Sequence, residues 1–142
     1  MMKKIITILF IGLVSFSINA QEKTAKIEFK SDTIDYGTIE KGSNGLRVFE
    51  FTNTGDAPLI ISRVTSSCGC TVPTWTREAV LPGKKGEVQV KYDTNRVNPI
   101  RKTITVISNA ETPTVALKIK GEVIDSSKES ILEKKDKSLV EQ

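Results

Sequence analysis

The chain has 142 residues, a net charge of +4 at pH 7 and 38% hydrophobic residues. This length is typical of one domain that buries a sufficient core without disulfides. The sequence contains no histidine, which excludes Ser-His-Asp and Cys-His nucleophiles and histidine-ligated metal sites. Basic residues are scattered and are not interleaved with aromatic residues, so nothing in the pattern indicates nucleic-acid binding.

The N-terminal segment has the layout of a secretory signal peptide. Lys3 and Lys4 precede an apolar run over residues 5–18, and the small residue Ala20 precedes Gln21. The run is shorter than the roughly 20 apolar residues that a membrane span needs. We therefore predict a signal peptide over residues 1–20, a periplasmic or secreted protein, and no membrane attachment after cleavage.

Short segments with period-two alternation follow, which is typical of half-buried strands. Residues 21–31 form a lead-in with a possible edge strand at 26–29, and a further short strand is expected near Ile34 or Ala79. The stronger strand predictions, in chain order, are residues 46–53, 59–64, 86–92, 100–108 and 114–123. About seven to eight strands between turn signals predict an all-β sandwich or barrel over residues 32–124.

The same alternation predicts which side chains are buried. Phe49 and Phe51 share one face of their segment, whereas Glu50 and Thr52 take the other. The candidate core residues are Phe49, Phe51, Leu59, Ile61, Val88 and Val90.

Three residues at the junction of the strands predicted at 46–53 and 59–64 are interpreted as structural turn residues. Asn53 can bond nearby backbone with its side chain, and Gly55 is free to take a positive φ. Pro58 can open the next strand, where its missing N–H is tolerated.

Residues 125–142 differ in composition, because charges of both signs alternate there with few large apolar residues. We expect a charged, disordered tail or at most a marginal helix. A docking segment is the alternative interpretation.

The only two cysteines lie one residue apart in Ser67-Cys68-Gly69-Cys70-Thr71, with Trp75 shortly after. One interpretation is a pair of free thiols packed beside the core, with Trp75 as a neighbour. A second is a structural disulfide, which Gly69 would help to close with unusual backbone angles. A third is functional, with Cys68, Gly69, Cys70 and Trp75 forming a thiol redox site or a two-sulfur site for Cu(I).

Several of these motifs together resemble the bacterial DUF1573 family. The resemblance rests on Asp35-Tyr36-Gly37, Phe49-Glu50-Phe51-Thr52-Asn53-Thr54-Gly55, the Ser-Cys-Gly-Cys-Thr block and Leu81-Pro82-Gly83. It implies an exported immunoglobulin-like β-sandwich, akin to Hydin-type and PapD-like domains, in a family with no established activity. The turn at residues 96–100 departs from the family pattern, because Asn98-Pro99 replaces its usual glycine and aromatic residue.

The sequence therefore predicts an exported binding or structural module of the cell envelope that is not an enzyme and needs no cofactor. An immunoglobulin-like sandwich can recruit protein partners through edge strands or end loops. The alternative function is thiol redox chemistry or Cu(I) handling through Cys68 and Cys70. The oligomeric state does not follow from the sequence.

Overall fold

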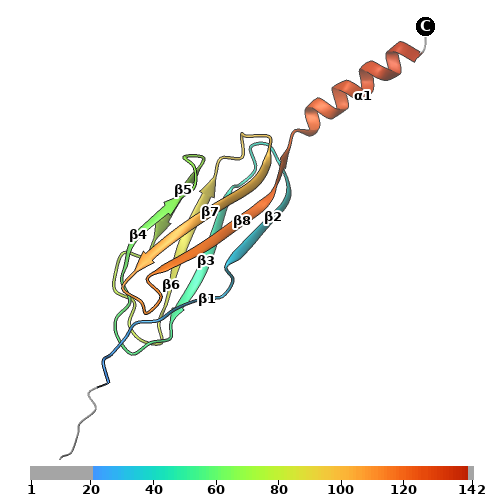
Figure 1. Ribbon diagram of the computed structural model, residues 1–142. Coiled ribbons are helices and arrows are strands. Elements are labelled where there is room, and N and C mark those ends of the chain that lie inside the picture. The colour runs from blue at the N-terminus through green and yellow to red at the C-terminus, as the bar shows by residue number, and fades with distance from the viewer. Residues whose placement is uncertain (1–20, 141–142) are drawn as a thin grey trace, which may run out of the picture.

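The computed structural model describes residues 21–140, so the predicted signal peptide lies outside the described residues. The chain folds into two facing four-stranded sheets followed by one helix (Figure 1). The first sheet has the strand order β1-β3-β6-β5 and the second β2-β8-β7-β4. The strands are β1 (Ile27–Phe29), β2 (Thr33–Glu40), β3 (Leu46–Asn53), β4 (Ile61–Ser66), β5 (Thr71–Trp75), β6 (Lys85–Tyr92), β7 (Pro99–Ser108) and β8 (Thr114–Ile124).

The core lies between the two sheets, and it is built by the alternation that the sequence shows. Phe49 and Phe51 point inward from β3, while Val88 and Val90 point inward from the paired strand β6. All six core candidates are buried, with exposed fractions of 0–5%. The prediction of an all-β immunoglobulin-like sandwich with eight strands is confirmed.

Two strands differ from the sequence prediction. The strand expected from residue 59 begins at Ile61, because Leu59 instead forms an isolated bridge with Val80. Strand β5 was not predicted, since its five residues include Pro73, and Val72 and Trp75 are their only large apolar side chains besides it. The short strand expected near Ile34 is part of β2.

Strands β2 and β8 pair in parallel, and their ladder is interrupted between Asp35 and Thr38. Gly37 has a φ of 66° at this irregularity, which a side chain would disfavour. On β8, the neighbouring strand of the same sheet, a Cβ on Gly121 would lie 2.8 Å from the Tyr36 Cβ. The two glycines therefore let β2 bend closely over β8 while Tyr36 turns into the core.

Asn53 is a fully buried polar residue that ties four segments together. Its Nδ2 donates to the carbonyl oxygens of Ala57 (2.7 Å) and Val80 (2.9 Å). Its Oδ1 accepts from the backbone N–H groups of Gly55 (3.0 Å) and Lys26 (3.3 Å). The expected bonding to local backbone is thus confirmed, and it extends to two segments that are distant in sequence.

Gly55 was expected to use a positive φ, and this prediction was wrong. The structure requires glycine there for space, because a Cβ would lie 2.2 Å from the Thr24 carbonyl oxygen. Pro58 precedes the Leu59 bridge, and its carbonyl accepts a hydrogen bond from Asn109 Nδ2 at 3.0 Å. Asn98 has no positive φ either, so the turn before β7 is built without a left-handed residue.

Residues beyond β8 form helix α1 (Ser126–Val140), so of the two expected forms of this segment, a disordered tail or a marginal helix, the structure has the helix. Its Lys, Glu and Leu residues favour helix, and Asp125 accepts a hydrogen bond from the Ser127 hydroxyl in the first turn. This bond is the main cause that lowers the pKa of Asp125. The helix projects away from the sandwich, opposite the end where residue 21 lies (Figure 1). Within residues 21–140, no helix is long and apolar enough to cross a membrane.

Candidate functional site

The Cys68-Gly69-Cys70 segment lies where the chain crosses from one sheet to the other. It joins β4, at the edge of the second sheet, to β5, at the edge of the first. The Ser67 N–H donates to the Thr103 carbonyl (3.0 Å), and the Asp93 N–H donates to the Cys70 carbonyl (2.9 Å). Backbone pairing to both sheets therefore holds the segment at both of its ends.

Cys68 and Cys70 are joined by a disulfide with a Cα–Cα distance of 5.4 Å. The interpretation as free packed thiols was wrong, and the disulfide interpretation is the one that the structure supports. Cys70 is 6% exposed and belongs to the core, whereas Cys68 is half-buried. The Cys70 N–H lies 3.3 Å from Cys68 Sγ and donates to it.

Two sulfur atoms bonded to each other do not offer the thiolate pair that Cu(I) would need. Among residues 21–140, no three His, Cys, Asp or Glu side chains lie close enough together to hold a metal ion. Handling of Cu(I) would therefore depend on prior reduction of the bridge.

The role predicted for Gly69 in closing the disulfide is not what the structure shows. Gly69 has no positive φ, and apart from its neighbours Cys68 and Cys70 no residue among 21–140 has an atom within 4 Å of the place its Cβ would occupy. An alanine would therefore fit at this position. The bridge also closes only a three-residue loop, for which loop-closure entropy predicts about 1.6 kcal/mol of stabilisation.

Trp75 stands at the other end of β5, about 17 Å along the extended chain from Cys70. Its Nε1 donates to the Ile61 carbonyl (3.3 Å), and the Arg77 guanidinium stacks 3.7 Å from its ring centre. Trp75 thus occupies the first backbone carbonyl of β4. The structure separates it from the disulfide, although the sequence placed them together.

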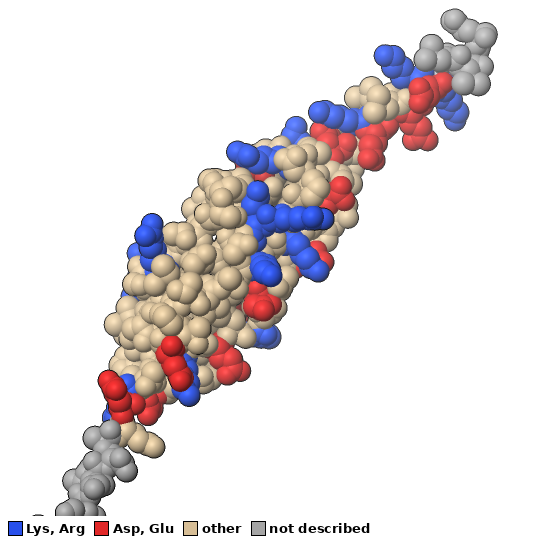
Figure 2. All heavy atoms as spheres, viewed as in Figure 1, with Lys and Arg blue, Asp and Glu red and all other residues tan. Residues whose placement is uncertain are grey.

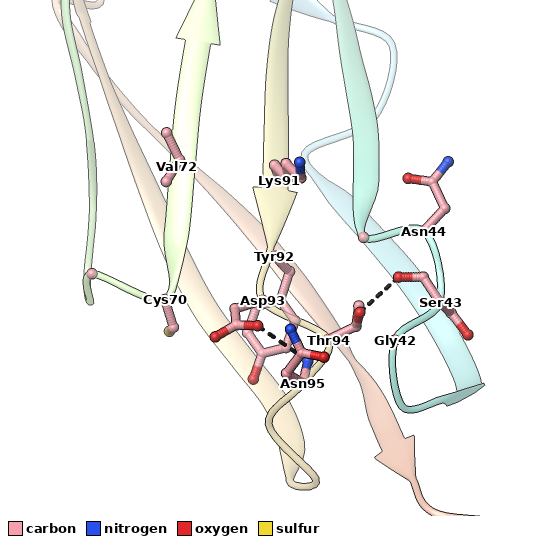
Figure 3. Close-up of a pocket in the computed structure, with 12 residues that line it drawn as sticks. Gly42, Ser43, Asn44, Cys70, Val72, Lys91, Tyr92, Asp93, Thr94 and Asn95 are labelled. Carbon is pink, nitrogen blue, oxygen red and sulfur yellow. Dashed lines mark hydrogen bonds between the residues drawn. The ribbon is translucent and has the colours of Figure 1, made fainter.

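An open hollow of about 580 Å³ lies beside the disulfide at this end of the sandwich (Figure 3). Three segments line it: the loop before β3, the start of β5, and the end of β6 with the residues after it. The lining residues are Gly42, Ser43, Asn44, Gly45, Gly69, Cys70, Val72, Lys91, Tyr92, Asp93, Thr94 and Asn95. No motif spacing connects these segments, so the hollow could not be predicted from the sequence.

The walls of the hollow are held by hydrogen bonds between the loop before β3 and the end of β6. Thr94 Oγ1 donates to the Ser43 carbonyl (2.6 Å), a bond that Figure 3 shows. The Tyr92 N–H donates to the Gly45 carbonyl (3.0 Å), and the Tyr36 hydroxyl donates to the same oxygen (2.7 Å). Burial is the main cause that raises the pKa of Tyr36 to about 12. The hollow is therefore preformed.

One side of the hollow is formed by the edge strand β5. The Asp93 N–H donates to the Cys70 carbonyl, and the Thr76 N–H donates to the Glu87 carbonyl. In an antiparallel pair, every second residue forms such hydrogen bonds, so the backbone groups of the even-numbered residues from Cys70 to Thr76 point toward β6. The intervening residues Thr71, Pro73 and Trp75 therefore direct their backbone groups to the free edge. Val72 is 60% exposed on the outer face of this strand.

A second surface is the outer face of the β2–β8–β7 sheet, where basic side chains gather (Figure 2). The register places Arg101 opposite Lys120, and Lys118 lies two residues before Lys120 on β8. Asp35 on β2 forms an ion pair with Lys120 at 3.7 Å. The outward-facing residues of these three strands include no aromatic side chain, so this face lacks the stacking groups of a nucleic-acid site.

Comparison with known proteins adds a family and a fold. The family model "Protein of unknown function (DUF1573)" matches residues 27–123. No curated protein matches the chain. A protein of unknown function from Porphyromonas gingivalis W83 is similar in structure, with 24% identity and a TM-score of 0.64 over 70% of this chain and 47% of that one.

Two further solved structures share the fold at low identity. The ASH/PapD-like domain 7 of human CEP192 has 12% identity and a TM-score of 0.60, over 72% of this chain and 87% of that one. The secreted serine protease VesC from Vibrio cholerae has 14% identity and a TM-score of 0.54, over 70% of this chain and 23% of that one. The chain thus spans about half of the P. gingivalis protein and about a quarter of VesC.

Proposed function

Because the chain belongs to the DUF1573 family, whose model matches residues 27–123, and carries an immunoglobulin-like fold, we propose that it is an exported, non-catalytic binding module. Its partner is a protein that adds an extended segment to the free edge of β5, beside the Cys68–Cys70 hollow. The single observation that carries this proposal is the outward-directed backbone of β5 next to a preformed hollow.

The other three edge strands are less suited to receive a partner strand. Strand β1 has only three residues, and β2 is interrupted at its Tyr36–Gly37 irregularity. At β4, the Trp75 indole occupies the Ile61 carbonyl. An added strand gains affinity from main-chain hydrogen bonds, so an edge that is short, irregular or covered offers few of them.

Strand β5 also offers a means of selecting its partner. Pro73 has no N–H and can only accept at the free edge, so a partner strand must place a donor opposite it. Exposed Val72 and the Lys91 side chain next to it in register provide an apolar contact and a charge. Together they fix where a partner segment would sit along the edge.

Export is tested by the N-terminus of the protein recovered from cells. The signal-peptide pattern supports cleavage after Ala20, so mass spectrometry of the envelope fraction should find a mature chain beginning at Gln21. Recovery of the uncleaved chain in the cytosol would contradict export.

Binding is tested by a photoreactive amino acid placed at Val72 in the organism of origin, with Ile60 as the matched position. Ile60 is similarly apolar and 46% exposed, but it lies outside β5. We expect one protein to cross-link at position 72 and not at position 60, and the purified pair to bind at least tenfold less tightly with Val72→Glu than with Ile60→Glu. Equal cross-linking at both positions, or equal affinity of the two variants, would refute the β5 site.

A further inference from the structure

The Cys68–Cys70 bridge does not hold distant parts of the chain together. Backbone hydrogen bonds already fix its two ends, through Ser67 to Thr103 on one side and Cys70 to Asp93 on the other. Both contacts are between backbone groups and involve neither sulfur atom. We therefore expect reduction of the bridge to leave the pairing of β4 with β7 and of β5 with β6 intact.

The two sulfur atoms differ in access. Cys70 is buried in the core, whereas Cys68 is half-buried and the neighbouring Gly69 is exposed. Apart from Cys68 and Cys70 themselves, no residue that the structure describes has an atom within 4 Å of the position that a Gly69 side chain would take, so no other described part of the chain covers this turn. Since thiol–disulfide exchange depends on which sulfur a thiolate can reach, an incoming thiolate meets Cys68 first.

The hydrogen bonds around the bridge also assign different roles to the two sulfur atoms. The Cys70 N–H donates to Cys68 Sγ at 3.3 Å, and such a donor stabilises a thiolate on Cys68. The Thr71 hydroxyl lies 3.8 Å from Cys70 Sγ and can donate to it when that sulfur departs. These contacts favour attack of an incoming thiolate at Cys68 Sγ and departure of Cys70 Sγ as the leaving thiolate.

We propose that the Cys68–Cys70 disulfide undergoes thiol–disulfide exchange with a partner dithiol, with Cys68 as the sulfur that is attacked and Cys70 as the leaving sulfur. A partner thiolate attacks Cys68 Sγ, the Cys68–Cys70 bond breaks, and Cys70 leaves as a thiolate that takes up a proton. The partner's second thiolate then attacks the partner's first sulfur in the mixed disulfide, and Cys68 leaves as a thiolate that takes up a proton. The partner loses two electrons and becomes a disulfide, and this chain gains them as a dithiol.

The first test uses buffers of reduced and oxidised glutathione as the probe. Alkylation followed by mass spectrometry measures the reduced fraction, and circular dichroism follows the fold in the same samples. We expect the bridge to be reduced within the glutathione range while the β-sheet signal is unchanged, since structural disulfides resist reduction by glutathione. A bridge that stays oxidised in excess reduced glutathione, or that opens only on unfolding, would overturn the proposal.

The second test separates the roles of the two cysteines. With oxidised glutathione, Cys70→Ala should form a mixed disulfide at Cys68 at least about tenfold faster than Cys68→Ala forms one at Cys70, because access limits exchange. Equal rates would refute the assignment of Cys68. If either variant fails to unfold cooperatively, the wild-type samples of the first test are quenched with acid. Mass spectrometry should then locate the mixed disulfide with glutathione on Cys68.

Discussion

The two ends of the sandwich contain the two most distinctive sequence blocks of the chain, and they are built differently. At the Asn53 end, a buried amide makes four hydrogen bonds and Gly55 fits against backbone with no room for a Cβ. At the Cys68–Cys70 end, Gly69 faces open space and a hollow adjoins the bridge. The fold accounts for Asn53 and Gly55, but it does not account for the cysteines and Gly69.

This difference distinguishes residues that serve the fold from residues that are available for chemistry. Buried polar groups are costly unless they are paired, so the contacts of Asn53 explain its presence without a ligand. The disulfide closes a loop of three residues, and its small entropic benefit does not explain it in the same way. Four variants or conditions test the contrast, beginning with the largest expected effect.

Asn53→Ala should lower the free energy of unfolding by about 3 kcal/mol, because it leaves the Ala57 and Val80 carbonyls without their donor. Chemical denaturation measures the change. Asn44→Ala is the matched control, since Asn44 is exposed and its side chain makes one hydrogen bond, to the Leu46 N–H. A similar loss in both variants would mean that burial of Asn53 is not what matters.

Gly55→Ala should cost about 2 kcal/mol, because its methyl group would meet the Thr24 carbonyl and force the backbone apart. Gly69→Ala is the paired variant at the other end, and it should change stability by less than about 0.5 kcal/mol. Thermal unfolding of the two proteins side by side gives both values. Comparable losses would remove the distinction between the two ends.

Tyr36 should make stability depend on alkaline pH. Burial favours its neutral phenol and raises its pKa from 10.0 to about 12, so its stabilisation is complete below pH 10 and is lost as the pH rises toward 12. The loss should reach about 2 kcal/mol. Because lysines also titrate there, the measurement is the difference between wild type and Tyr36→Phe. Parallel pH profiles of the two proteins would contradict this prediction.

Reduction of the disulfide should have a smaller effect than the loss of Asn53, Gly55 or the Tyr36 phenol, at most about 1.6 kcal/mol from loop closure. Urea denaturation with and without a phosphine reductant measures it. A loss of more than about 3 kcal/mol would mean that the bridge stabilises the fold, and it would weaken the contrast between the two ends.

Most of the fold could be predicted because period-two alternation is a local signal. The segment 46–53 coincides with β3, and the boundaries of β6 and β8 differ from prediction by one residue. Strand β5 was missed, because the period-two signal is short and is interrupted by Pro73. Helix α1 was expected only as a marginal helix beside a disordered tail, since its composition predicts little burial. Its helix propensity and its N-terminal cap favour the helix even without burial.

The site was harder to predict because it depends on contacts between distant segments. The hollow joins Ser43, Val72 and Asp93, which no spacing rule connects. The sequence identified the cysteine motif but not the bond between the cysteines, because a Cys-x-Cys spacing is compatible with both states. Trp75 was grouped with the cysteines by proximity in sequence, whereas the extended strand carries it away from them.

The parallel pairing of β2 with β8 has a mechanical consequence. Residue 21 and helix α1 lie at opposite ends of an elongated molecule, and β8 runs directly into that helix. Tension applied between these two ends would pull β8 lengthwise past its neighbours β2 and β7. Their ladders would then be loaded in shear, with many hydrogen bonds resisting at once instead of opening one by one.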